Sequence, residues 1–82
     1  MSKTFEMFLI DEGVLDASTL GGWMTYVRNS DRDEFDEIIN LAVAAQNAPG
    51  ADRNAVNVYT LFLAAIYPEA WTKWVVIRRL VG

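Results

Sequence analysis

The stretch NAVNVYTLFLAAI, residues 54–66, decides how the rest of the chain must fold. Its polar residues, Asn54, Asn57 and Thr60, lie three positions apart, so a helix here has one narrow polar stripe and is apolar elsewhere. The stretch does not alternate with period two, and it is longer than a typical strand of about five or six residues. The pattern therefore predicts a central helix that other helices cover on several sides. We expect burial of Val56, Val58, Tyr59, Leu61, Phe62, Leu63 and Ile66.

The flanks of this stretch indicate where the central helix begins and ends. Asp52 can cap the free N–H groups at its start. Pro68 disfavours helical geometry at Tyr67 and can itself open a new helix, where a missing N–H costs nothing. We therefore predict a central apolar helix over about 53–66 and a separate final helix that begins at Pro68.

A first helix is predicted over residues 2–12, because Phe5 and Phe8 recur at helical spacing within an apolar segment. Ser2 is the expected N-cap. Gly13 is well placed to end the helix in a left-handed backbone conformation.

A second helix, capped by Asp16 or Ser18, is predicted to run through Arg28. Gly21 and Gly22 fall inside it, although two glycines cost a helix up to about 2 kcal/mol relative to alanine. They indicate either close packing against another helix or a helix that begins after Gly22. The functional alternatives are a hinge or a surface pressed by a partner. The expected core face comprises Leu20, Trp23, Met24 and Val27.

A third helix is predicted to begin at Ser30, in a capping box with Asp33, and to end before the breaker sequence at residues 47–50. Acidic residues crowd its start, where the helix dipole favours negative charge. With about five short helices around the central one, the chain is predicted to be all-α, a compact bundle and a single domain over residues 1–82. The inner face of the third helix should comprise Phe35, Ile38, Ile39, Ala42 and Val43.

The composition excludes several chemistries. Cysteine is absent, which removes disulfides, thiolate catalysis and soft-metal sites, and histidine is absent, which removes the usual general base and the commonest metal ligand. A calcium loop would need an oxygen ligand at Phe35 and a glycine at Asp36. We therefore expect no enzyme, no cofactor and no metal. No apolar run reaches the length of a membrane span, and no leader pattern opens the chain, so a cytoplasmic protein that binds no membrane is expected.

Charge is divided unevenly along the chain. Residues 1–37 hold nine acidic and three basic side chains, whereas residues 38–82 hold two acidic and four basic ones. An acidic first half argues against direct binding of nucleic-acid phosphates. We predict a non-catalytic module that binds another protein through an acidic face on the third helix. This acidic face comprises Asp31, Asp33, Glu34, Asp36 and Glu37.

The C-terminal stretch WTKWVVIRRLVG, residues 71–82, is the second candidate surface. Tryptophan and arginine are enriched where interfaces bind most strongly, although the tryptophans could instead close the core. Self-association could use Val76, Leu80 and Val81. The residues of this second candidate surface are Trp71, Trp74, Arg78 and Arg79.

Two other functions fit the same features. One is a phage- or mobile-element-encoded inhibitor that blocks a host nucleic-acid enzyme, as a nucleic-acid mimic or steric blocker in the manner of an anti-CRISPR. The other is a structural subunit that associates with itself to form a homo-oligomer.

Two short motifs, TFEMFL at residues 4–9 and YPEAW at residues 67–71, resemble the opening and closing motifs of the YozE-type, sterile-alpha-motif-like small bacterial domains. That family pairs an N-terminal F-x-x-[YF]-L with a late [FY]-x-E-A-W, and the middle of this chain does not follow the family. The resemblance implies a small helical bundle used for protein–protein contact, with no catalytic residues. The matching positions are Phe5, Phe8, Leu9, Tyr67, Glu69, Ala70 and Trp71.

Overall fold

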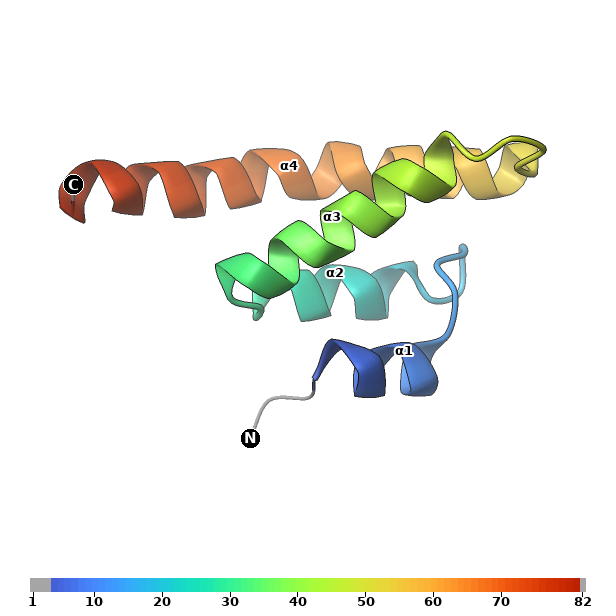
Figure 1. The fold of residues 1–82 in the computed structure, drawn as a ribbon, viewed down its shortest axis with the longest axis horizontal. Coiled ribbons are helices and arrows are strands. Elements are labelled where there is room, and N and C mark those ends of the chain that lie inside the picture. The colour runs from blue at the N-terminus through green and yellow to red at the C-terminus, as the bar shows by residue number, and fades with distance from the viewer. Residues whose placement is uncertain (1–3, 82) are drawn as a thin grey trace.

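The computed structural model describes the backbone of residues 4–81 and the side chains of residues 4–69 and 72. Within residues 4–81 the chain forms four α-helices and no strand, which confirms the all-α prediction (Figure 1). The second helix packs against each of the other three, and the third and fourth also pack against each other. None of the helices in this range combines the length and the apolar character that a membrane span requires. The helices are α1 (Phe5–Glu12), α2 (Leu20–Arg28), α3 (Arg32–Gln46) and α4 (Arg53–Val81).

The fourth helix runs without interruption through Pro68, so the predictions of a separate final helix and of five helices are wrong. A proline in a helix interior costs about 3 kcal/mol, because it removes one N–H and its ring crowds the preceding turn. On both sides of the proline the helix contacts the rest of the bundle. Ile66 is buried in the core, and Arg28 at the end of α2 donates from Nε to Oε2 of Glu69 at 2.9 Å. The buried Ile66 is the stronger of these two contacts, because the Arg28 and Glu69 side chains are about half exposed.

Over residues 53–69, one face of α4 is buried rather than most of its circumference. Two helices, α2 and α3, pack against it within the described part of the chain, and they leave its outer face open. Leu61 lies on this outer face and is 62% exposed, so the prediction that it is buried is wrong. The polar stripe formed by Asn54, Asn57 and Thr60 is exposed, as its spacing predicts. Among the described side chains of α4, the buried ones are Tyr59, Phe62, Leu63 and Ile66.

Trp23 joins three helices in the centre of the core. The side chain is 1% exposed, and its ring meets those of Phe8 on α1 and Phe62 on α4 edge-on, at centroid distances of 5.5 and 5.8 Å. Such edge contacts stabilise aromatic pairs beyond the burial of their area. The indole Nε1 donates to the carbonyl oxygen of Gly13 at 3.2 Å, so the polar group of this buried ring is also satisfied.

The first helix begins at Phe5, because Thr4 caps it. The Thr4 hydroxyl oxygen accepts the N–H of Met7 at 3.2 Å, and the Thr4 backbone is extended, as N-cap residues usually are. The prediction that Ser2 caps this helix is therefore wrong. Gly13 ends α1 as predicted, since its φ is +79° and its N–H donates back to the last turn at 2.9 Å.

A hydrogen-bonded turn precedes α2. The hydroxyl and the N–H of Ser18 and the N–H of Thr19 donate to Oδ1 of Asp16 at 2.6, 2.8 and 3.0 Å. These bonds, those from Ser18 first, hold the pKa of Asp16 below its usual value. The helix itself starts at Leu20, with Thr19 as its N-cap. Asp16 therefore caps the preceding turn, and the prediction that Asp16 or Ser18 caps the helix is wrong.

The third helix is capped by Asp31, whose Oδ1 accepts the N–H of Glu34 at 2.9 Å. Ser30 is buried, and its hydroxyl donates to the carbonyl oxygen of Val27 at 2.7 Å. The Ser30 side chain thus closes the short link after α2, and the predicted capping box of Ser30 with Asp33 is wrong.

The inner face of α3 packs into the core as its spacing predicts, except at Val43, which is 36% exposed. Residues 47–52 then form a mostly exposed loop that leads into α4. At the end of this loop Oδ2 of Asp52 accepts the N–H of Ala55 at 3.4 Å, in keeping with the predicted cap. The buried residues of α3 are Phe35, Ile38, Ile39 and Ala42.

Candidate functional site

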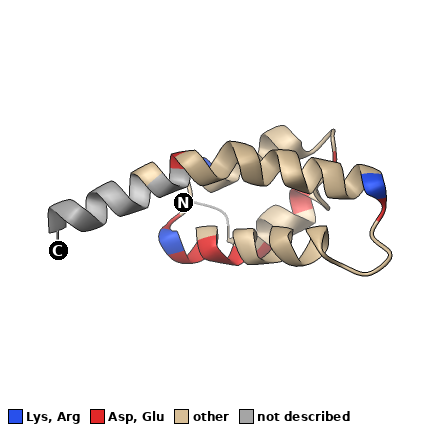
Figure 2. Ribbon diagram, turned by 90° about the horizontal axis from the view of Figure 1, so that it is seen from above, with Lys and Arg blue, Asp and Glu red and all other residues tan. Residues whose placement is uncertain are grey.

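The acidic face occupies the first two turns of α3 (Figure 2). Asp33, Asp36 and Glu37 are exposed on the side of the helix that faces away from the core. No ion pair joins any of these three carboxylates to another side chain that the structure describes. Asp31 is exposed as well, but its carboxylate caps the helix. The outer surface of α3 therefore presents exposed negative charge on a helix whose other face is anchored in the core.

Glu34 differs from the other members of the acidic face, because its side chain is partly buried and turns toward α2. Its Oε2 accepts a hydrogen bond of 2.6 Å from the hydroxyl group of Tyr26. Partial burial raises the pKa of the Tyr26 phenol above its ordinary value, and the hydrogen bond to the Glu34 carboxylate raises this pKa further. Tyr26 therefore stays protonated at neutral pH and acts as a fixed donor to Glu34.

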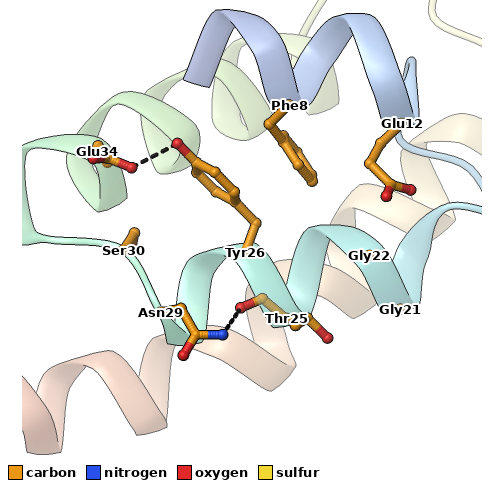
Figure 3. A pocket seen from close by; sticks show the side chains of 9 residues that line it. All are labelled: Phe8, Glu12, Gly21, Gly22, Thr25, Tyr26, Asn29, Ser30 and Glu34. Atoms are coloured by element: carbon orange, nitrogen blue, oxygen red, sulfur yellow. Dashed lines mark hydrogen bonds between the residues drawn. The ribbon is translucent and has the colours of Figure 1, made fainter. Parts of the chain in front are cut away.

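A pocket of about 430 Å³ lies between α1, α2 and the start of α3 (Figure 3). Glu12 on α1 and Glu34 on α3 stand at opposite ends of this pocket. The rings of Phe8 and Tyr26 lie between them, stacked with their centroids 4.3 Å apart. The pocket thus has an apolar middle and a carboxylate at each end.

Gly21 and Gly22 form part of the α2 wall of this pocket. Both lie inside α2, so the alternative that the helix begins after Gly22 is wrong. A Cβ atom added at Gly22 would lie 2.5 Å from Oε2 of Glu12, whereas one added at Gly21 would meet nothing within 4 Å. Close packing therefore explains Gly22, although the group that approaches it is a side chain rather than a helix backbone. Gly21 leaves the wall open.

The second candidate surface, comprising Trp71, Trp74, Arg78 and Arg79, belongs to the C-terminal part of α4. These side chains lie outside the described residues, and so do those of Val76, Leu80 and Val81. This surface stays a prediction.

The acidic face could be predicted from the sequence, whereas the pocket beside it could not. The glycine pair was a signal, because it is costly inside a helix. Its partner Glu12 gave none, because its position over Gly22 depends on how α1 packs across α2. The sequence likewise gives no signal for Tyr26, because its role depends on the packing of α3, which places Glu34 beside its hydroxyl group.

Among the described residues, no three carboxylates come close enough together to hold a metal ion. Comparison of the chain with family models, with curated proteins and with solved structures gives no match. The resemblance to the YozE-type domains stays a prediction.

Proposed function

We propose that the protein is a non-catalytic interaction module that binds a basic surface of another protein through the acidic face of α3. The observation that carries this proposal is the set of exposed carboxylates at Asp33, Asp36 and Glu37, none of which forms an ion pair with another described side chain. They project from a helix that is held in place by four buried residues, so the surface is presented on a rigid element.

The spacing of these carboxylates supports a cationic partner. Asp33 lies three residues before Asp36 and four before Glu37, and like charges at such spacing destabilise a helix by about 0.2–0.5 kcal/mol per pair. A basic partner surface would relieve this repulsion and would also be steered toward the face over long range. Charge complementarity of this kind sets partner choice and association rate more than affinity.

The resemblance of the two end motifs to YozE-type domains points in the same direction, because that resemblance implies a bundle used for protein contact. The absence of cysteine from the chain is in keeping with a reducing compartment, and we propose the cytoplasm as the location.

The experiment captures partners from a lysate of the native host and compares three baits by quantitative mass spectrometry. The baits are the unchanged chain, the variant Asp33→Asn with Glu37→Gln, and the control Asn54→Lys with Asn57→Lys. Variant and control change the net charge equally, but the control residues lie on the exposed stripe of α4. A genuine partner should be retained by the control and lost from the acidic-face variant. A partner retained equally by both would place the binding surface elsewhere.

Salt provides an independent test on the same partner. Raising the ionic strength from about 0.1 M to 1 M shortens the Debye length from about 10 Å to about 3 Å, so binding to exposed carboxylates should weaken steeply. A salt-insensitive complex would contradict the proposal. A captured nucleic-acid enzyme would favour the inhibitor alternative, and a molar mass that rises with concentration in light scattering would favour self-association.

A further inference from the structure

We propose that the pocket between α1, α2 and the start of α3 receives an arginine side chain of the partner protein. This inference rests on the proposed function, because it assigns a specific contact to the same acidic surface. Glu34 belongs both to the acidic face and to the pocket, so a partner docked on the outer carboxylates of α3 can place a side chain directly into it.

The charge of the pocket selects a cation. Two of its nine described lining residues, Glu12 and Glu34, are acidic, and none of the nine is basic. The Oε2 atom of Glu34 accepts from Tyr26, while Oε1 has no hydrogen-bond partner among the described residues. The Glu12 carboxylate likewise has no partner in the described part of the chain. Both ends of the pocket can therefore accept hydrogen bonds from a charged donor.

The middle of the pocket selects a long side chain with an apolar stem. The rings of Phe8 and Tyr26 form the wall between the two carboxylates (Figure 3). An arginine can lay its methylene groups along such a wall and keep its charged head at a carboxylate. Its planar guanidinium also stacks on aromatic rings and binds a carboxylate in a fixed fork, which the ammonium of lysine cannot do.

Gly21 leaves its part of the pocket wall without a side chain. It lies inside α2, where an alanine would favour the helix, and an added Cβ would meet nothing within 4 Å. Packing in the isolated protein therefore does not require a glycine here.

The test is a titration of the isotope-labelled protein, followed by amide NMR shifts, with N-acetyl-arginine methylamide as the probe. N-acetyl-citrulline methylamide is the matched control ligand, since it has nearly the same shape and no charge. The arginine probe should shift the amides of Gly21, Gly22 and Thr25, and citrulline should bind about tenfold more weakly or worse, because the charge-assisted hydrogen bonds are lost.

Variants localise the binding. Glu12→Gln and Glu34→Gln should each weaken the arginine probe severalfold, whereas Glu6→Gln on α1 and Glu37→Gln on α3 should bind it as the unchanged chain does. Glu6 and Glu37 are exposed and do not line the pocket. Circular dichroism should show that all four variants keep their helices.

Several results would overturn the inference. These are the absence of any shift, equal binding of citrulline, shifts confined to the outer face of α3, and tighter binding of the diamine putrescine than of the arginine probe. Failure of the proposed function would look different. The probe would still shift the pocket amides, but Asp33→Asn with Glu37→Gln would retain every captured partner.

Discussion

Two neighbouring residues of α4 should respond very differently to truncation. Phe62 is completely buried and meets the ring of Trp23 edge-on, whereas Leu61 is 62% exposed on the outer face. Replacing a buried phenylalanine by alanine costs about 3–5 kcal/mol, of which the aromatic pair accounts for roughly 0.5–1.5. A domain of this length has a free energy of unfolding of about 4–12 kcal/mol, at about 0.05–0.15 per residue. Phe62→Ala should therefore remove a quarter or more of the total stability.

Leu61→Ala should change the free energy of unfolding by only about 0.5 kcal/mol, as surface substitutions usually do. Urea unfolding followed by far-ultraviolet circular dichroism measures both variants. If Phe62→Ala does not fold, Phe62→Leu provides the comparison. It removes less buried volume, so it should cost less than Phe62→Ala but at least the roughly 0.5–1.5 kcal/mol of the lost ring contact. A Leu61→Ala variant as unstable as the Phe62 variants would mean that α4 is covered on both faces, and the one-sided packing described above would be wrong.

Four further predictions concern single side chains. Gly21→Ala should raise the free energy of unfolding by about 0.5–1 kcal/mol, because an exposed helical position gains a methyl group that meets nothing. Gly22→Ala should gain less in the same urea titration, because its methyl group must displace the carboxylate packed over it. Thr4→Ala should lower the melting temperature by about 4–8 °C, as expected for the loss of an N-cap worth about 1 kcal/mol. The hydrogen bond from Arg28 lowers the pKa of Glu69. The ion pair therefore stabilises the fold fully at pH values above the ordinary carboxyl pKa. This stabilisation is lost as the pH falls through the lowered pKa of Glu69. Glu69→Gln should thus lower the free energy of unfolding at neutral pH. The variant should also lose less of this free energy than the unchanged chain as the pH is lowered, which urea unfolding across that pH range would show.

The helical class and much of the core could be predicted from periodicity. Phe5, Phe8, Trp23 and Phe62 repeat at helical spacing or fall within one apolar run, and all four are buried. Such patterns are informative because an apolar face must be covered by something. They do not show how many neighbouring helices pack against an apolar helix, so the predicted burial of Leu61 is wrong.

Helix ends and the pocket depended on tertiary contacts that no local pattern contains. Pro68 favours a helix boundary, yet α4 continues through it, with Ile66 buried before the proline and Glu69 bonded to Arg28 after it. The sequence favours Ser30 as the N-cap of α3, but the Ser30 hydroxyl donates to the carbonyl oxygen of Val27. Asp31 is the N-cap instead. The pocket requires α1 and the start of α3 to lie along one side of α2, and the packing of the whole core sets this arrangement.

The loop after α3 is a suitable site for attaching a label or a tag. Residues 47–52 are mostly exposed, and α3 has fifteen residues, which at about 1.5 Å each place this loop about 22 Å from the start of that helix (Figure 1). Exposed loops tolerate insertions well. An affinity peptide inserted at Gly50, or a dye attached there, would leave the carboxylates and the pocket unobstructed. The protein could then be immobilised through this loop, with the acidic face directed toward the expected partner.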